Sequence, residues 1–332
     1  MKRAGNLMPL VADMDNLQEA FLRAARGKSD RIEVISFREN LQNELLQIQK
    51  DLLEGSYTFG EYKKFTIFEP KERVICAAQF RDRVTFHALM CVCHSTFENF
   101  QVYHSYASRI GKGTYKAVEQ AKKYASRYKW FAKLDVRHYF DSIDHQILLR
   151  LLCRLFKDER LILLFQNLLD TYQTEKDKGL PIGNLTSQYF ANHYLAVADH
   201  YFLEHLRVKA MVRYMDDFLL FCDDKEMLKD YVSSVVRFMK DELSLELHEP
   251  VVNKTSYGVP FLGYVVKPEK ICLNQQSRSR FRKKVRRLDE QYKEGVINEI
   301  EYRIHYEPLR TFVNKANSKN FVRKTGNISV GL

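Results

Sequence analysis

The sequence predicts an α+β protein, because short apolar strands are interleaved in pairs with helices along its 332 residues. The order strand, helix, hairpin, helix differs from the regular alternation of a doubly wound parallel sheet. Neither GxGxxG nor GxxxxGKS/T occurs, so dinucleotide-binding and P-loop proteins lose their main support. A chain of this length can bury a large core, and we expect two or three subdomains.

The N-terminal part is expected to be helical, and a β-hairpin is expected to follow it. Over residues 13–55 apolar residues recur at helical spacing, and Gly55 provides a stop. Alternating and β-branched residues over 57–84 predict a hairpin that turns near Glu69 and Pro70. Further helices are expected over 83–100, 111–126, 144–156, 185–206 and 225–243. Strands are expected over 130–136, 211–215 and 218–222, and a strand or hairpin over 260–266.

Positive charge is concentrated near the end of the chain. The net charge is +11, and from residue 266 onward 16 Lys and Arg stand against 7 Asp and Glu, so this segment holds +9 of the total. A basic segment attached to a balanced body is typical of proteins that bind a polyanion, most simply nucleic acid. A basic face that only keeps the protein soluble would give the same count.

The six cysteines are expected to be reduced thiols. The stretch HALMCVCH (87–94) brings two His and two Cys together, which would suit zinc, but no second CxxC or HxxxH completes such a site. Core packing is therefore the favoured interpretation. No stretch reaches the length of a membrane span, and acids come too early for a signal peptide. We expect a cytoplasmic protein with no membrane partner.

Two adjacent acids, Asp216 and Asp217, interrupt the stretch RYMDDFLLF (213–221) between two apolar segments. The pair is expected to form a two-residue hairpin turn, although Asp-Asp is a poor former of such turns. A local rule broken inside a consistent pattern suggests a functional site. A solvated acidic turn is the alternative.

A third acid, Asp135, ends the apolar strand in KWFAKLDV, and more strand-like residues follow it. If this strand lies beside the hairpin, three carboxylates meet at one point, where they would repel one another and raise their pKa values. Two Mg²⁺ ions would remove this penalty, because hard oxygen ligands suit Mg²⁺ and a metal pair stabilises phosphoryl transfer. Nearby Asp141 is expected in a turn and Asp144 at a helix N-cap.

Six blocks of the chain, taken in order, resemble the reverse transcriptases. The fingers are matched by residues 71–84 and 105–114, and the palm by FAKLDVRHYFDSIDH (131–145), LPIGNLTSQYFANHYL (180–195), YMDD (214–217) and NKTSYGVPFLGYVV (253–266). The resemblance implies a right-hand polymerase fold with fingers, a ferredoxin-like palm with an antiparallel sheet, and a helical thumb. It also implies RNA-directed DNA polymerase activity by two-metal-ion nucleotidyl transfer.

The resemblance divides the chain into parts with expected boundaries. These are an N-terminal helical extension (1–55), fingers (56–130, with part of 145–190), a palm with the catalytic motifs (131–265) and a basic helical thumb (266–332).

A subfamily is also suggested. Ile182 to Gln188 fits the pattern (I/V/L)GxxxSQ, which resembles reverse transcriptases of diversity-generating retroelements. Such enzymes copy a template-repeat RNA into cDNA with errors at adenines, for mutagenic retrohoming, and act with a small basic accessory protein. A group II intron-like or retron-type enzyme is the alternative, although no VTG triplet and no space for a maturase or endonuclease domain are evident. An inactive nucleic-acid-binding scaffold is a further alternative.

The resemblance assigns the metal site to the three acids. Asp135 and Asp216 would bind the two Mg²⁺ ions directly. The carbonyl of Val136 would be a backbone ligand, and Asp217 an adjacent supporting acid. Phe140 matches the steric gate that excludes a ribose 2′-hydroxyl and so favours deoxynucleotides.

The expected nucleotide-binding residues are Lys71, Arg73, Phe140, Ile182, Gly183, Ser187, Gln188 and Lys254. Lys71 and Arg73 match residues that hold the triphosphate, where arginine suits bidentate phosphate contact. Gly183 would let the backbone approach a base pair closely. Lys254 matches a proposed proton donor to pyrophosphate, although a surface lysine would look the same. Group II intron and retroviral enzymes usually carry a glutamine at the position of Ile182. Because isoleucine lacks the hydrogen bonding of that amide beside the nascent base pair, we expect it to relax fidelity opposite template adenine.

The segment RSRFRKKVRRLDEQYKEG (278–295) resembles a thumb helix. Its apolar stripe, which includes Phe281 and Val285, would pack on the body and leave cations for template RNA and the RNA–DNA duplex. The expected nucleic-acid-binding residues are Arg280, Arg282, Lys283, Lys284, Arg286 and Arg287.

Overall fold

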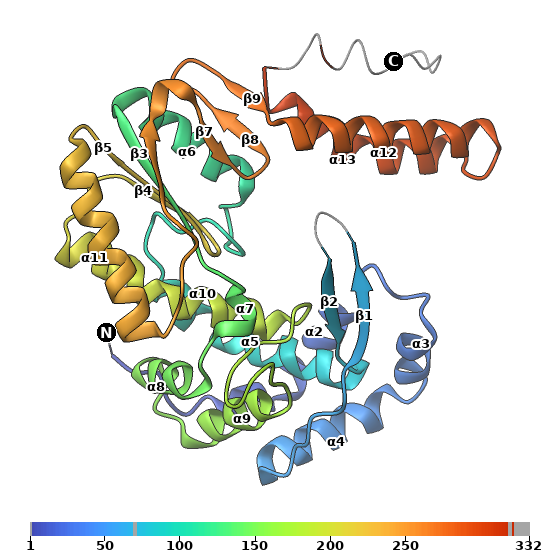
Figure 1. Cartoon of the computed structure of the whole chain (residues 1–332). Helices are drawn as coiled ribbons and strands as arrows, with labels where there is room; N and C mark the ends of the chain where they lie inside the picture. The colour runs from blue at the N-terminus through green and yellow to red at the C-terminus, as the bar shows by residue number, and fades with distance from the viewer. Residues whose placement is uncertain (1, 69–71, 318–320, 322–332) are drawn as a thin grey trace. The chain divides into compact units, whose positions relative to one another are not determined.

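The structure is a computed structural model, and it describes residues 2–68, 72–317 and 321 (Figure 1). Helices and short antiparallel strands are interleaved along the chain, as the sequence predicts. The expected hairpin turn at Glu69 and Pro70 lies outside the described residues. Among the described helices, none has the length and apolar character needed to span a lipid bilayer.

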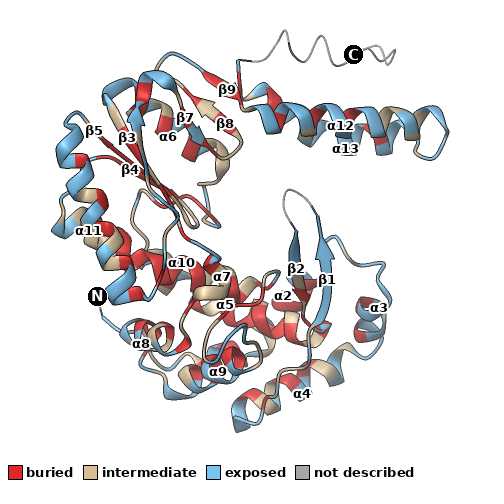
Figure 2. Cartoon of the chain, in the orientation of Figure 1, coloured by how far each residue is buried: buried red, intermediate tan, exposed pale blue. Residues whose placement is uncertain are grey.

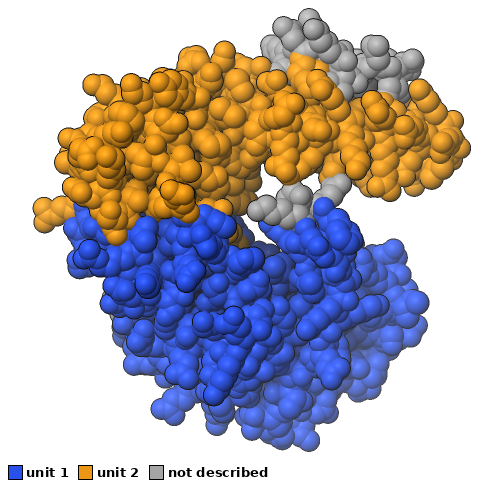
Figure 3. Space-filling view, viewed as in Figure 1, with its two compact units in different colours: residues 1–108, 136–206, 234–248 blue, residues 109–135, 207–233, 249–332 orange. Residues whose placement is uncertain are grey.

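The chain forms two compact units, and each is assembled from separate stretches (Figure 3). Unit 1 contains residues 1–108, 136–206 and 234–248. Unit 2 contains residues 109–135, 207–233 and 249–332. Because both units are discontinuous in sequence, they do not test boundaries drawn at residues 55, 130 and 265, which stay predictions.

Unit 1 begins with the predicted N-terminal helices. These are α1 (Met8–Val11), α2 (Met14–Ala25), α3 (Ile32–Glu39) and α4 (Leu41–Glu54). The side chain of Asp13 caps α2, and α4 ends at Gly55, whose φ of 72° is left-handed. The hairpin of β1 (Lys63–Ile67) and β2 (Arg73–Ala77) follows. The helical stretch and the hairpin were therefore predicted correctly, except that residues 80–84, expected in the hairpin, are helical.

The core of unit 1 is formed around two long helices, α5 (Phe80–Phe100) and α10 (Leu185–His200), whose inner faces are buried (Figure 2). A π-helical turn, η1 (Tyr201–His205), extends α10. The other helices of this unit are α7 (Tyr139–Ser142), α8 (His145–Leu155), α9 (Glu159–Asp170) and the second part of α11 (Lys225–Leu243).

Three expectations for unit 1 can be compared with these helices. The side chain of Asp144 accepts a hydrogen bond from the Ile147 amide at 2.9 Å, so the N-cap prediction is confirmed. The residues after Asp135 were expected to continue as a strand, which is only partly correct. Val136 forms an antiparallel β-bridge with Leu247, but the chain then turns at His138, with φ of 43°, into α7. This short helix also includes Asp141, which was expected in a turn.

The centre of unit 2 is an antiparallel four-stranded sheet in the order β4-β5-β3-β6. Its strands are β3 (Trp130–Asp135), β4 (Met211–Tyr214), β5 (Asp217–Cys222) and β6 (Val251–Lys254). Helix α6 (Thr114–Arg127) lies against β4 and β5. The middle of β5 is buried throughout, which explains its continuous apolar sequence.

A second sheet and a helical hairpin complete unit 2. The sheet contains β7 (Val259–Phe261), β8 (Tyr264–Val266) and β9 (Ile271–Leu273), and α12 (Gln275–Lys293) and α13 (Glu299–Asn314) follow it. The hydroxyl of Tyr264 donates to the Phe312 carbonyl at 2.8 Å, which ties α13 to the sheet. A short 3₁₀ turn, η2 (Thr255–Tyr257), connects β6 to β7.

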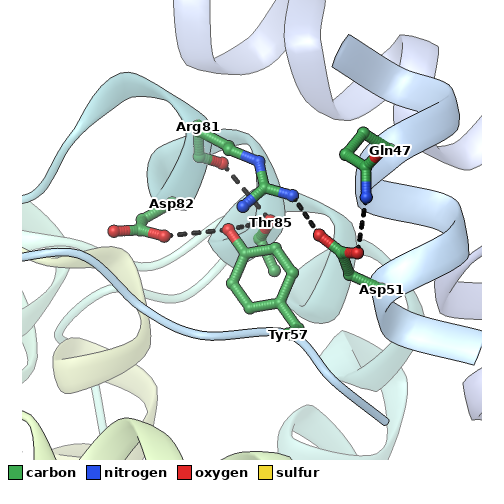
Figure 4. A network of polar contacts seen from close by, with 6 residues as sticks. All are labelled: Gln47, Asp51, Tyr57, Arg81, Asp82 and Thr85. Carbon is green, nitrogen blue, oxygen red and sulfur yellow. Dashed lines mark hydrogen bonds and ion pairs between the residues drawn. The ribbon is translucent and has the colours of Figure 1, made fainter. Parts of the chain in front are cut away.

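The FRDRV motif (80–84) at the start of α5 connects this helix to the N-terminal helices of unit 1. Arg81 forms an ion pair with Asp51 of α4 (Figure 4), and Arg83 forms one with Glu33 of α3. Both arginines therefore bind the N-terminal helices rather than standing free for a substrate.

The aspartate of the same motif organises a buried network (Figure 4). Asp82 accepts hydrogen bonds from the Tyr57 hydroxyl at 2.8 Å and from the Gly60 amide at 2.9 Å. The Thr85 hydroxyl donates to Tyr57 at 2.9 Å. Burial raises the pKa of Asp82 and the pKa of Tyr57. The network fixes the chain between α4 and β1 onto α5.

Candidate active site

The three predicted acids lie at one end of the unit 2 sheet. Asp135, the last residue of β3, is directly opposite Asp217, the first residue of β5. Residues that are opposite in an antiparallel pair project from the same face, with Cβ atoms about 4.5–5.5 Å apart. Asp216 immediately precedes Asp217 and lies in the turn between β4 and β5. The sheet therefore brings together carboxylates that are separated by about eighty residues of sequence.

The position of the turn differs from the expectation by one residue. Tyr214 pairs with Asp217, so the two turn residues are Met215 and Asp216, not Asp216 and Asp217. Met215 has a φ of 53°, which is rare for a residue other than glycine or asparagine. Such backbone strain persists only where surrounding contacts fix it and is concentrated at functional sites.

Two contacts support this turn from within unit 2. The guanidinium of Arg213 is completely buried and donates from Nη1 to the Met215 carbonyl at 3.2 Å. The Thr114 hydroxyl donates to the Tyr214 hydroxyl at 3.1 Å. The carbonyl of the strained residue and the side chain before it are thus both held.

The charge of Asp217 is only partly compensated. Its Oδ2 lies 3.3 Å from the Lys133 ammonium, while its Oδ1 is buried and accepts no hydrogen bond from the described residues. Burial, with smaller contributions from Asp135 and Asp216, raises the pKa of Asp217 to about 7, against the opposing effect of Lys133. The carboxylate is therefore in an environment that favours the uptake of a proton or a cation.

The donor set suits a hard divalent cation. Three carboxylates at one sheet end, one with an oxygen that has no hydrogen-bond partner among the described residues, are the ligand type that Mg²⁺ prefers. Within the described part of the chain, no three His, Cys, Asp or Glu side chains are already arranged closely enough to hold a metal ion. The HALMCVCH stretch is included in that statement: His94 is hydrogen-bonded through Nδ1 to the Tyr189 hydroxyl at 2.8 Å.

The predicted nucleotide-binding residues of unit 1 meet at the loop before α10. The Leu180 amide donates to the Phe140 carbonyl at 2.7 Å, and the Cys76 amide of β2 donates to the Ile182 carbonyl at 2.8 Å. One short loop thus connects the expected steric-gate residue to the strand that begins at Arg73. The side chains of Phe140 and Ile182 are half-buried, and Arg73 is exposed.

Gly183 is held close to the same strand. Its φ is 119°, and a Cβ at this position would lie 3.0 Å from Ile75 Cγ2 and 3.2 Å from the Cys76 carbonyl oxygen. A side chain is therefore disfavoured by both backbone conformation and space. The glycine allows β2 and the loop to approach each other, a reason that differs from the predicted approach to a base pair.

The other predicted residues of this stretch have varied surroundings. Ser187 is buried inside α10, so the structure does not present its hydroxyl at a surface. Gln188 is half-buried, and its Oε1 accepts a hydrogen bond from the Ser108 hydroxyl at 3.0 Å. Lys71 lies outside the described residues.

Lys254 is placed away from the carboxylates. It ends β6 opposite Trp130, the first residue of β3, whereas Asp135 is the last. Five residues of strand separate these positions, or about 16 Å. The Lys254 ammonium lies 5.6 Å from the centre of the Trp130 ring. The structure therefore does not bring Lys254 together with Asp135, and the expected proton-donor role has no support in unit 2.

The basic helix α12 has the predicted two faces. On one face, Phe281 and Val285 are buried. Of the six cations predicted to bind nucleic acid, Arg280 is half-buried and the other five are exposed. The exposed cations are Arg282, Lys283, Lys284, Arg286 and Arg287. Helix α13 packs against the stripe side, where Tyr302 donates to Asp289 at 2.9 Å.

Comparison with known families identifies relatives by sequence. The family model described as "Reverse transcriptase (RNA-dependent DNA polymerase)" matches residues 63–266. The putative COX1/OXI3 intron 2 protein of Saccharomyces cerevisiae is 21% identical over 67% of this chain and 34% of its own length. The group II intron-encoded protein LtrA of Lactococcus lactis subsp. cremoris is 24% identical over 49% and 29%. The chain thus spans about a third of the length of these curated relatives.

Solved structures show the same fold at low sequence identity. A Candida albicans telomerase solved with a fragment of telomeric RNA superimposes with a TM-score of 0.53, at 11% identity, over 88% of this chain and 66% of that one. Apo telomerase from Candida tropicalis, truncated at its C-terminal domain, gives a TM-score of 0.51 at 13% identity, over 65% and 55%. The predicted fold class, α+β with the right-hand polymerase architecture, is confirmed.

Proposed function

The chain belongs to the reverse transcriptase family, and from this premise we propose that it is an RNA-directed DNA polymerase. The single observation that carries the proposal is the pairing of Asp135 with Asp217 at the end of the sheet, next to Asp216 in the turn. A buried carboxylate oxygen to which no residue in the described part of the chain donates is costly at this point unless a cation binds there. We propose that the cation is Mg²⁺ and that two ions are held.

Each group of the chain has a separate part in the proposed reaction. The primer 3′-hydroxyl loses its proton to solvent, and its oxygen attacks the α-phosphorus of a deoxynucleoside triphosphate. A P–O bond forms there, the bond between the α-phosphorus and the oxygen that bridges to the β-phosphate breaks, and pyrophosphate leaves. Asp135 and Asp216, with the Val136 carbonyl, would hold the two ions, and Asp217 supports them. When bound, the ions would stabilise the charge on the attacking and leaving oxygens. Arg73 would hold the triphosphate, and Phe140 would exclude a 2′-hydroxyl.

The proposed partners are template RNA, the RNA–DNA duplex and deoxynucleotides. The exposed cations of α12 support a grip on the duplex backbone, which is independent of sequence and sensitive to salt. We also propose a cytoplasmic location, which the six cysteines support, because none of them forms a disulfide.

Primer extension tests the proposed activity. Wild type should extend oligo(dT) on poly(rA) with Mg²⁺, Asp216→Ala should not, and Asp230→Ala, on an exposed position of α11, should match wild type. A folded wild-type protein that never extends a primer would favour the alternative of an inactive nucleic-acid-binding scaffold.

We further propose that the enzyme is of the diversity-generating retroelement type. The residues from Ile182 to Gln188 support this proposal, and the adenine errors of mutagenic retrohoming are its expected output. A group II intron-like enzyme is the second candidate, favoured by the similarity to intron-encoded proteins. A retron-type enzyme remains an alternative within the same class.

Fidelity separates these candidates. Ile182→Gln keeps the backbone carbonyl that binds β2 but changes the side chain. We expect it to lower misincorporation opposite template adenine by about tenfold or more, because the loss of discrimination at one such contact is worth roughly 1–3 kcal/mol. The matched control is Ile32→Gln, since Ile32 is 86% exposed on α3. Equal adenine errors in wild type and Ile182→Gln would refute the assignment to Ile182. A small basic protein encoded beside this chain, and copurifying with it, would support the accessory partner.

A further inference from the structure

We propose that Lys133 and Arg213 are positioning residues that hold the catalytic hairpin from opposite faces of the sheet. The inference rests on the proposed function, since it assigns what keeps Asp216 and Asp217 in place. Neither residue is among the acids or nucleotide-binding positions that the sequence suggested.

Lys133 acts on the face that carries the carboxylates. It precedes Asp135 by two residues on β3, so both side chains project from the same face. Its neighbour across the strand pair is Leu219, and Asp217 lies two residues before Leu219, on the diagonal that a long side chain can reach. The ammonium lies 3.3 Å from Asp217 Oδ2. It also donates to the Pro260 carbonyl at 3.4 Å, so its own position is supported.

This contact decides which oxygen of Asp217 is available. Oδ2 is occupied by the ammonium, and Oδ1 is the buried atom without a hydrogen-bond partner among the described residues. Lys133 therefore orients the carboxylate so that one oxygen is left for a cation. It also places a positive charge beside three carboxylates before any metal binds.

Arg213 acts on the other face. It pairs with Phe218, and because adjacent strand residues alternate, its side chain projects away from Asp217 and into the buried side of the sheet. Its guanidinium, which is fully buried and lies 5.8 Å from the centre of the Phe218 ring, donates to the Met215 carbonyl. This bond fixes the residue with φ of 53° that leads into Asp216.

The two contacts predict opposite changes in metal binding. Without the ammonium in Lys133→Met, the carboxylates attract a cation more strongly but are less well oriented, so Mg²⁺ affinity should rise while kcat falls. Without the guanidinium in Arg213→Met, the turn that carries Asp216 is released, so both Mg²⁺ affinity and kcat should fall. Groups that orient metal ligands are worth roughly 10–100-fold in affinity or activity.

The experiment combines kinetics with two measurements that need no turnover. Primer extension gives kcat and the KM for dTTP for four variants: Lys133→Met, Lys133→Arg, Arg213→Met and Arg213→Lys. The matched control is Lys129→Met, because Lys129 is exposed and lies just before β3. We expect kcat to fall roughly 10–100-fold in the two Met variants, with KM nearly unchanged, and the conservative variants to recover part of it. Calorimetric Mg²⁺ titration reports affinity, and hydrogen exchange over residues 211–222 in the metal-free protein should be faster in both Arg213 variants.

The outcomes separate the two proposals. The positioning role would be overturned if the two Met variants fold and keep the wild-type kcat. It would also be overturned if Lys133→Met leaves the Mg²⁺ affinity unchanged and Arg213→Lys leaves hydrogen exchange unchanged. If wild type itself never extends a primer, the proposed function fails, and calorimetry and exchange still decide whether the two residues hold the hairpin. The conservative Arg213→Lys variant keeps the test valid if Arg213→Met does not fold.

Discussion

Replacing Asp217 with Asn should stabilise the metal-free protein at neutral and alkaline pH, although it removes a proposed active-site acid. The carboxylate is mostly buried, with 18% of its side chain exposed, and it faces Asp135 and Asp216. Lys133 is the cation that opposes these effects, yet the pKa of Asp217 is still raised to about 7. Asparagine is uncharged, like the protonated acid, so the variant carries at every pH the neutral side chain that this site favours.

The sign and size of the effect follow from this pKa. An unfolded chain returns Asp217 to a pKa of 3.8, so the folded protein binds the proton more tightly. The stability conferred by that proton is complete below pH 3.8 and is lost as the pH rises through about 7. The difference between the folded and unfolded pKa values lowers the free energy of unfolding of wild type by about 4 kcal/mol at pH 8, and by about 2 kcal/mol at pH 5, relative to the protonated form.

Urea unfolding in the presence of a chelator measures this difference between pH 5 and pH 8.5. The stability advantage of Asp217→Asn should grow with pH, and the exposed control Asp230→Asn should show no such trend. Added Mg²⁺ should stabilise wild type more than the variant. An advantage that does not change with pH, or a variant less stable than wild type at pH 8, would refute the reasoning about burial and crowded charge.

Three further predictions concern unit 1. Gly183→Ala should lower the free energy of unfolding by about 1–3 kcal/mol, and more than Gly295→Ala, because both have positive φ but only the Gly183 Cβ would meet β2. Tyr57→Phe should cost about 1–3 kcal/mol in urea unfolding, since Asp82 loses a buried donor; an unchanged midpoint would show that water replaces it. Phe140→Ala should raise ribonucleotide incorporation roughly tenfold or more in primer extension, and unchanged sugar selectivity would exclude a gate at this residue.

The strand end at Asp135 and the acidic hairpin could be predicted because both depend on local pattern. Apolar residues at strand spacing stop where the acids begin, and burial of β5 requires that pattern. The register of the turn could not be predicted, because sequence rules reject a methionine with positive φ. Met215 adopts it because strand pairing places Tyr214 opposite Asp217 and the buried Arg213 holds the Met215 carbonyl.

Contacts that depend on distant partners were also missed. Residues 71–84 resemble a fingers block, but nothing local in that stretch indicates that Arg81 pairs with Asp51, thirty residues earlier. The helix α9 was not singled out, although its apolar spacing and Asp158 cap give an ordinary helix signal. For Lys133 a signal existed: a lysine two residues before Asp135 on an apolar strand must share its face.

Stability and the proposed chemistry act against each other at this sheet end. Burying Asp217 beside Asp135 and Asp216 costs free energy as long as no cation is bound, and the raised pKa of Asp217 is the sign of that cost. The Lys133 ammonium reduces this cost at Asp217 but does not remove it, because it lies against Oδ2 and leaves Oδ1 without a hydrogen-bond partner among the described residues. A second lysine would stabilise the fold further, but it would occupy the oxygen that a metal needs. The incomplete neutralisation of Asp217 therefore fits the proposed metal site, whereas a purely structural ion pair would leave no acceptor unpartnered.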